Sequence, residues 1–222
     1  MHELYSQFMR PGDLVFDIGA NVGEYTEMFA RLGARVVAVE ANPELIGDLE
    51  KIRPRNLISV ESVAVGPREG AAELYICQEN LLSSLSRDWI TVAQKSDRLS
   101  RFEWKKSTLV PVTTLDALIE KYGRPRFIKI DVEGFELEVL AGLTQAPEVM
   151  SFEFNSEYAQ QAKVCLRQEC IRPGCLFNVT MESNMSLLFE RWLTIEELLA
   201  YLRRVELKSL HTWGDIFVKT KA

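Results

Sequence analysis

Charged residues interrupt an apolar stretch near the middle of the chain, Phe127–Glu136. Lys129 and Asp131 alternate there with isoleucine and valine, and the two-residue period of a strand places both charges on one face. A strand buried on both sides of a parallel sheet is normally apolar throughout, so these charges indicate a chemical role. The pattern then changes at Val-Glu-Gly to helical spacing, which places Asp131 at a carboxyl end of the sheet. Ligands of open α/β sheets bind at that edge.

Four ionisable residues near this edge are candidates for proton transfer: Asp131, Glu133, Lys129 and Glu153. We favour Asp131 as a general base because it ends the central strand. Lys129 lies deeper, where a lysine keeps its charge only beside an acid, so we expect a structural pair with Asp17 or Glu153. Glu133 has a second interpretation, in which it stabilises the N-terminus of the following helix.

A glycine loop follows the first expected strand, 14–18, and leads into a helix. Its glycines are Gly19 and Gly23, whereas a dinucleotide fingerprint needs glycine at the places held here by Asn21 and Glu24. A carboxylate beside a pyrophosphate would be repelled. A cofactor without phosphate that carries a sulfonium cation would meet no such penalty, which indicates S-adenosylmethionine.

Glu40 ends the second expected strand, 35–40, where an acid can hold a ribose diol through two hydrogen bonds. Alternatively, Glu40 is a capping or surface acid, and the glycines only form a tight turn between strand and helix. The residues that we expect to bind the cofactor are Asp17, Gly19, Asn21, Gly23, Glu40 and Asp131.

Length and composition fit one domain over residues 1–222. A net charge of -6 argues against a general nucleic-acid or anionic-membrane binder. No apolar run approaches the roughly 20 residues that cross a bilayer, and the N-terminus lacks the pattern of a signal peptide, so a cytoplasmic location is expected. The four cysteines have poor zinc spacing and are expected to be reduced, and His211 is expected to be structural. The oligomeric state stays open.

Strands and helices alternate along the chain, which predicts an α/β fold with a mostly parallel sheet and helices on both faces. A hairpin-like addition is expected from 62–65 and 72–76, and a short edge strand at 110–113. The expected sheet strands after the first two are 57–60, the central strand from 127, 148–154, 176–181 and 216–219. The expected helices include 4–9, 114–122, 156–171 and 194–204.

Periodicity fades between residues 81 and 107, and a long irregular segment in a compact domain is often functional. We interpret it as a lid or insertion over the acceptor, with Trp89 and Trp104 offering flat surfaces. The alternative is a solvated helix face with both tryptophans packed inside. Its second half concentrates basic residues that would attract an anion: Arg87, Lys95, Arg98, Arg101, Lys105 and Lys106.

Three motifs together resemble the FkbM-type S-adenosylmethionine-dependent methyltransferases: the glycine loop, Val39-Glu-Ala-Asn-Pro43, and Ile128-Lys-Ile-Asp-Val-Glu-Gly134. Leu82-Ser-Ser-Leu85 and Glu153 also resemble the family, and the match covers residues 11–154. The resemblance implies a Rossmann-like seven-stranded sheet whose last strand is antiparallel. It also implies methylation of a hydroxyl, often on a sugar or a polyketide-like product. The alternatives are a nicotinamide-dependent oxidoreductase and a catalytically inactive cofactor-binding domain.

The acceptor is expected to be a small saccharide or glycosylated metabolite carrying an anionic group such as phosphate or uronate. Oxygen ligands at two neighbouring strand ends would suit magnesium, and Asp131, Glu153 and Asn155 supply them. We favour a site without a metal, in which these groups serve as base and hydrogen-bond partners.

Overall fold

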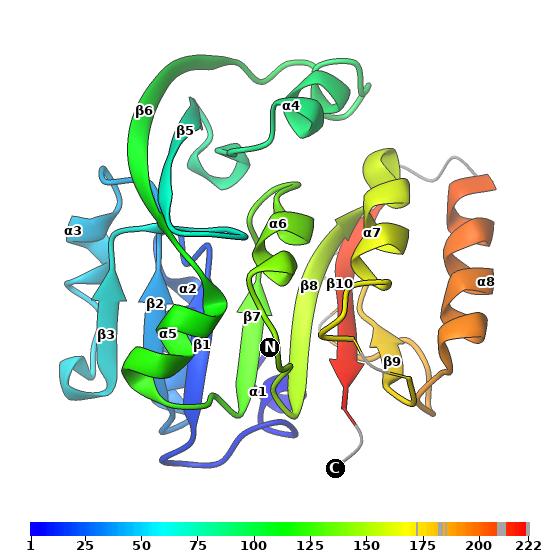
Figure 1. Cartoon of the computed structure of the whole chain (residues 1–222), viewed down its shortest axis with the longest axis horizontal. Helices are drawn as coiled ribbons and strands as arrows, with labels where there is room; N and C mark the ends of the chain where they lie inside the picture. The colour runs from blue at the N-terminus through cyan, green and yellow to red at the C-terminus, as the bar shows by residue number, and fades with distance from the viewer. Residues whose placement is uncertain (172, 182–183, 185, 208–211, 221–222) are drawn as a thin grey trace.

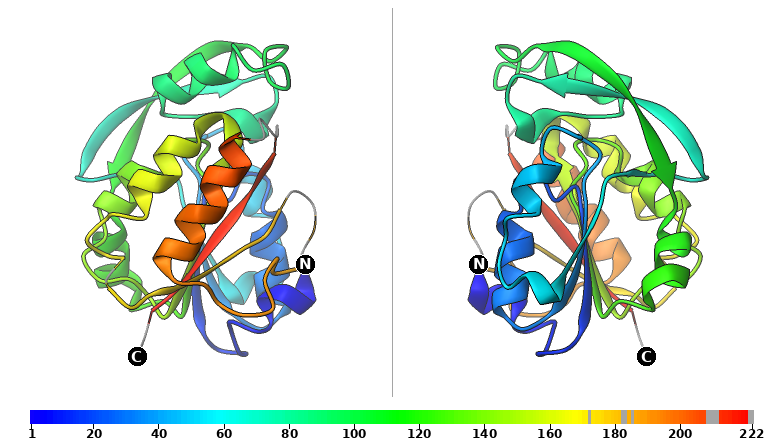
Figure 2. Two further views of the ribbon diagram at one scale, coloured as in Figure 1. Left: turned by 90° about the vertical axis from the view of Figure 1, so that its right-hand side faces the viewer. Right: turned by 90° about the vertical axis from the view of Figure 1, so that its left-hand side faces the viewer.

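A twisted seven-stranded sheet runs through the molecule, with helices on both faces (Figures 1 and 2). The structure is a computed structural model that describes residues 1–171, 173–181, 184, 186–207 and 212–220. The strand order is β3-β2-β1-β7-β8-β10-β9, and β10 is antiparallel to both of its neighbours. The strands are β1 (Leu14–Ile18), β2 (Arg35–Val39), β3 (Ile58–Glu61), β7 (Phe127–Ile130), β8 (Val149–Asn155), β9 (Leu176–Val179) and β10 (Trp213–Lys219). This arrangement confirms the expected Rossmann-like sheet with its antiparallel last strand.

Strand β7 lies at the centre of the sheet, with all four of its residues buried. Parallel pairing sets Lys129 beside Asp17 of β1 on one side and beside Ser151 of β8 on the other. The neighbouring pair of β8 and β10 aligns Glu153 with Asp215. The strand register therefore brings charged residues from four strands together near one edge of the sheet.

The helices before β3 in the chain cover one face of the main sheet, and the helices from α5 onward cover the other (Figure 2). The first group is α1 (His2–Tyr5), α2 (Glu24–Arg31) and α3 (Ile46–Leu49). The second group is α5 (Leu115–Tyr122), α6 (Glu136–Ala141), α7 (Ala159–Cys165) and α8 (Ile195–Leu207). Each face has its own apolar core, one around Phe29 and Phe127 and one around Ile130 and Phe152.

A smaller three-stranded sheet and helix α4 lie across the carboxyl ends of the main strands (Figure 1). The elements are β4 (Ala64–Val65), β5 (Gly70–Cys77), α4 (Arg87–Ala93) and β6 (Trp104–Thr113), in the sheet order β4-β6-β5. The hairpin expected between 62–65 and 72–76 is therefore wrong, because β4 and β5 do not pair with each other. Each pairs with β6 instead. Leu74, Ile76 and Val110 form a separate apolar cluster that only this long-range pairing can bury.

Several expected boundaries also shift. Helix α1 is shorter than expected, and a 3-10 turn, Ser156–Tyr158, separates α7 from β8.

All four cysteines lie within the described residues, where they are buried and form no disulfide. No helix in the described part of the chain combines the length and apolar character that crossing a membrane requires. His211 lies outside the described residues.

Candidate functional site

Two adjoining cavities open at the carboxyl ends of β1, β2, β7 and β8. The glycine-loop cavity, about 50 Å³, lies against Glu40, Val63, Leu74 and Phe135. The carboxylate cavity, about 370 Å³, lies under the 81–107 segment. The two cavities share Gly19, Asn21, Leu81, Asp131 and Glu133. Further walls of the carboxylate cavity are Tyr25, Leu82, Trp89, Arg98, Leu99, Glu153, Asn155 and Trp213.

The glycine loop passes directly over the end of β7. Gly19 has φ +81°, and a Cβ atom there would lie 1.8 Å from the backbone oxygen of Asp131. Only glycine allows this close approach. Gly23 is a packing position instead, since its Cβ would collide with Ile52, and it is not among the described residues that line either cavity.

Asp17 is also set back from the cavities. Its carboxylate is 1% exposed and accepts a hydrogen bond of 2.6 Å from the Thr26 hydroxyl. Burial raises the pKa of Asp17 to about 6, although Lys129 and Thr26 favour its charged form. Asp17 therefore links β1 to α2 and is not among the described cavity-lining residues.

Glu40 holds the loop through backbone amides. One carboxylate oxygen accepts from the Asn21 amide at 2.8 Å, and the other accepts from the Asn42 amide at 2.7 Å. Burial raises the pKa of Glu40, while these amides oppose the change. Asn21 has φ +52°, a conformation that the bond to Glu40 helps to fix. Each carboxylate oxygen keeps a further lone pair for a ligand.

The turn after β7 is held in an unusual conformation. Glu133 has φ +51°, and its carbonyl accepts a 2.6 Å bond from the hydroxyl of Ser84, one of the two serines noted in the sequence. The amides of Val132 and Gly134 donate to the Glu136 carboxylate, both at 3.2 Å. A Cβ atom on Gly134 would lie 2.4 Å from Cβ of Trp89, so α4 packs directly on this turn.

Lys129 is 1% exposed and sits within a group of acids and a tyrosine. Its ammonium donates to Asp131 at 2.6 Å and lies 4.2 Å from the centre of the Tyr25 ring. Burial lowers the pKa of Lys129, but the surrounding acids outweigh it and hold the pKa well above its usual value. The expected partner, Asp17 or Glu153, is therefore wrong: Asp131 makes the direct bond. Asp215, which no sequence motif pointed to, is a further buried acid near Lys129.

Three carboxylates meet at the cavity floor. Asp131, Glu133 and Glu153 each offer an oxygen within 4.8 Å of the others. Burial, together with repulsion within this group, holds the pKa values of Glu133 and Glu153 well above the usual range. A carboxyl group with a raised pKa is a stronger base when it is ionised, and groups perturbed in this way are typical of sites of proton transfer.

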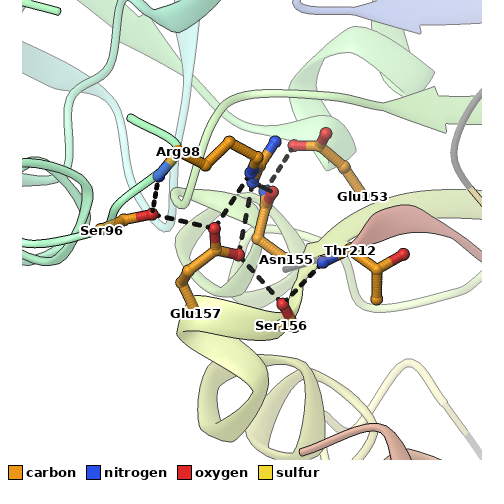
Figure 3. Close-up of polar contacts among 7 residues, drawn as sticks. All are labelled: Ser96, Arg98, Glu153, Asn155, Ser156, Glu157 and Thr212. Carbon is orange, nitrogen blue, oxygen red and sulfur yellow. Dashed lines mark hydrogen bonds and ion pairs between the residues drawn. The ribbon is translucent and has the colours of Figure 1, made fainter. Parts of the chain in front are cut away.

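Both polar atoms of the Asn155 side chain are hydrogen-bonded within the protein. Its amide oxygen accepts from Arg98 at 2.8 Å, and its amide nitrogen donates to Glu153 at 3.1 Å (Figure 3). Arg98 therefore occupies one lone pair of the only Asn155 side-chain oxygen, and a metal site of Asp131, Glu153 and Asn155 stays a prediction. The carboxylates that do meet include Glu133 in its place.

The basic residues of the 81–107 segment mostly face elsewhere. Arg98 is the one cation among the described residues of the carboxylate cavity, and it is bound to Glu157 at 3.0 Å. Arg87 pairs with Glu73 on the surface, and Arg101 lies over the Phe102 ring. Five of the six basic residues named in the sequence are therefore not among the described residues that line the cavity, and attraction of an anion by this segment stays a prediction.

The tryptophans of the segment are packed, as the alternative interpretation predicted. Trp89 is 1% exposed, and the Trp104 indole donates to the Leu82 carbonyl at 2.7 Å. Trp89 still forms part of the cavity wall, whereas Trp104 is not among its described lining residues.

Comparisons with known proteins agree with this architecture. A solved FkbM methyltransferase from Methylobacillus flagellatus KT matches with a TM-score of 0.53 at 15% identity, over 98% of this chain and 50% of that one. A precorrin-6y C5,15-methyltransferase from Geobacter metallireducens GS-15 matches with a TM-score of 0.50 at 12% identity, over 98% and 84% of the two chains. At these identities the likeness shows the fold alone.

Two curated relatives match in sequence. Ribosomal RNA large subunit methyltransferase E of Archaeoglobus fulgidus is 32% identical over 108 residues, which is 47% of this chain and 56% of that protein. Hexuronic acid methyltransferase AglP of Haloferax volcanii is 25% identical over 142 residues, 63% of this chain and 54% of that protein. The chain spans about half the length of the curated relatives it matches.

The family model of the methyltransferase FkbM domain matches residues 17–206, from the glycine loop to the end of α8. That span includes every described residue that lines the two cavities except Trp213, and most of the main sheet. The chain belongs to the FkbM methyltransferase family.

Proposed function

We propose that this chain is an S-adenosylmethionine-dependent methyltransferase that methylates a hydroxyl group on a saccharide or on a glycosylated or polyketide-like metabolite. The observation that carries the proposal is the meeting of Asp131, Glu133 and Glu153 at the floor of a cavity that adjoins the glycine loop. Family membership favours this activity over that of a nicotinamide-dependent oxidoreductase.

The residues around the glycine-loop cavity fit S-adenosylmethionine. Glu40 has lone pairs left for ribose hydroxyls, and Val63, Leu74 and Phe135 provide apolar surface for an adenine ring. Bound there, the cofactor would supply an electrophilic methyl group on a sulfonium. The Asp131 carboxylate, which lines both cavities, favours that positive charge.

The carboxylate cavity supplies the base. One oxygen of Asp131 is bonded to Lys129, so Asp131 is less available than the sequence indicated. Burial and neighbouring negative charges raise the pKa values of Glu133 and Glu153, which makes each carboxylate a stronger base when it is ionised. We infer that Glu153, with Glu133 beside it, receives the acceptor proton.

The cavity walls favour a small acceptor with little negative charge at its reacting end. Tyr25, Trp89 and Trp213 offer aromatic surface for a sugar ring, and the name of the hexuronic acid relative supports a saccharide. An RNA acceptor, which the other relative's name raises, would bring phosphates toward a floor of carboxylates. An anionic group on the sugar would have to reach Arg98, which is already paired.

We also propose that residues 81–107 act as a lid within a single domain. Helix α4 and the Ser84 hydroxyl contact the turn after β7 from above. Hydrogen exchange across this segment should slow when S-adenosylhomocysteine and an acceptor are added together. Equally slow exchange in the free protein would make the segment a fixed insertion.

A panel of acceptors with labelled methyl donor tests the function. The arms are neutral sugars, uronic acids, polyketides with phenols, and ribosomal RNA fragments. Transfer to a saccharide or polyketide hydroxyl supports the proposal, and transfer to RNA alone overturns it. Binding of the cofactor without turnover on any arm supports the inactive-domain alternative.

A further inference from the structure

Arg98 joins the lid segment to the end of β8 across the carboxylate cavity (Figure 3). It donates to Glu157 from Nε at 3.0 Å and from a terminal nitrogen at 3.3 Å. The same terminal nitrogen donates to the Asn155 amide oxygen at 2.8 Å. The guanidinium therefore bridges Asn155, the last residue of β8, and Glu157, which follows β8 in the chain.

Glu157 is well placed to hold Arg98 still. Its side chain is 8% exposed, and it accepts bonds of 3.1 Å from the Ser96 hydroxyl and the Ser156 hydroxyl. The Ser156 hydroxyl in turn accepts from the Thr212 amide at 3.0 Å. An ion pair that is shielded and hydrogen-bonded in this way keeps one geometry.

Arg98 decides which way the Asn155 amide faces. A guanidinium has donors and no acceptor, so the amide oxygen must face Arg98 and the amide nitrogen must face the other way. That nitrogen donates to Glu153 at 3.1 Å. A donor aimed at a carboxylate favours its ionised form.

We propose that Arg98 is a positioning residue: through Asn155 it orients Glu153 and keeps it ready to accept a proton while the lid segment lies over the cavity. Its catalytic meaning rests on the proposed function, whereas the coupling from Arg98 to Glu153 does not. Without Arg98, the amide is free to turn its oxygen toward Glu153, which disfavours the ionised carboxylate.

The charged groups around Glu153 make this donor important. Burial and the negative charges of Glu133, Asp131, Glu136 and Asp215 all raise its pKa. They come from the turn after β7, from α6 and from β10. The Asn155 amide is the described group that bonds directly to the Glu153 carboxylate and opposes them.

The coupling can be measured without an acceptor. Protein carrying glutamate with a ¹³C-labelled side-chain carboxyl is titrated by NMR, and the Glu153 signal is assigned by its loss in Glu153→Gln. Arg98→Met and Asn155→Ala should each raise the titration midpoint by roughly one pH unit, the size expected for one hydrogen bond to a charged group. Lys95→Met removes an exposed charge from the same segment and should leave the midpoint in place.

The double variant separates positioning from plain charge. If Arg98 acts through Asn155, adding Arg98→Met to Asn155→Ala changes little, because the orienting amide is already gone. Additive shifts of the Glu153 titration midpoint would mean that Arg98 acts through space, which overturns the proposal. An unchanged midpoint in Asn155→Ala alone would also overturn it, and that variant does not depend on whether Arg98→Met folds. Failure of methyl transfer in the wild type would refute the proposed function and leave this titration intact.

Discussion

The two cavities at the sheet edge are held by different kinds of group. Around the glycine-loop cavity, backbone atoms set the shape: Gly19 passes over the Asp131 carbonyl, and Glu40 binds two backbone amides. Around the carboxylate cavity, side chains bind one another, as in the contact between Arg98 and Glu157. The first arrangement tolerates many side chains but few changes at glycine. The second depends on a few named side chains.

This difference also separates the chemistry. A cofactor that stays the same from one family member to the next suits a pocket fixed by backbone. An acceptor suits a pocket whose side chains differ from protein to protein. Substitutions on the two sides should therefore affect different measurements, affinity for the cofactor on one side and turnover on the other.

Glu153→Gln should produce the largest change. Loss of a general base typically lowers turnover by about 10²–10⁴-fold, and the cofactor dissociation constant should stay within about twofold, because Glu153 lies outside the glycine-loop cavity. Glu138→Gln, on α6 away from both cavities, serves as the control for glutamate removal. Turnover of Glu153→Gln close to that of the control would remove Glu153 from the mechanism.

Glu136→Gln should stabilise the protein at alkaline pH. Burial raises the Glu136 pKa to about 7 from an ordinary 4.5, so the folded state holds a proton that the unfolded state has lost between those values. Stability should be highest below about pH 4.5 for this group and fall as pH rises toward 7.

Glutamine keeps an oxygen for the Val132 and Gly134 amides but carries no charge. Urea unfolding at pH 8 should show a gain of roughly 3 kcal/mol, and a flatter pH dependence than the wild type. Glu120→Gln, on an exposed position of α5, should show neither effect. A loss of stability at pH 8 would contradict the assigned ionisation.

Gly134→Ala should displace α4 from the turn after β7. The added Cβ would lie 2.4 Å from Cβ of Trp89, and the residue has φ +83°. Conformational strain and overpacking together should cost about 3 kcal/mol in urea unfolding. Gly12→Ala isolates the strain, since φ is +90° there with nothing within 4 Å, and should cost only about 1 kcal/mol. Equal losses in the two variants would show that Trp89 can move aside freely.

The sequence predicted the glycine-loop side far better than the carboxylate side. Gly19, Asn21 and Glu40 stand close together in the chain, so local spacing predicts their geometry, whereas Asp17 and Gly23 are not among the described residues that line the cavity. The same holds for Lys129 and Asp131, which share a strand face. The FkbM motifs and the alternation of strands and helices also predicted the main sheet correctly.

Contacts between segments far apart in the chain were not predicted from the sequence. The Ser84 bond to Glu133 spans 49 positions and the Arg98 bond to Glu157 spans 59. Pairing of β5 with β6 and the approach of Asp215 to Lys129 likewise depend on how distant segments fold back. The periodicity of either partner does not predict such contacts. The pairing of Arg98 with Glu157 was therefore not expected when the basic segment was interpreted as an anion-binding surface.

Calorimetry of cofactor binding tests the central claim most directly. S-adenosylmethionine and S-adenosylhomocysteine should bind one per chain, and Glu40→Gln should weaken both by about tenfold or more, because a charged acceptor of ribose hydroxyls is lost. Glu153→Gln measured alongside should bind both as the wild type does. Tighter binding of a nicotinamide dinucleotide than of S-adenosylmethionine would contradict the account.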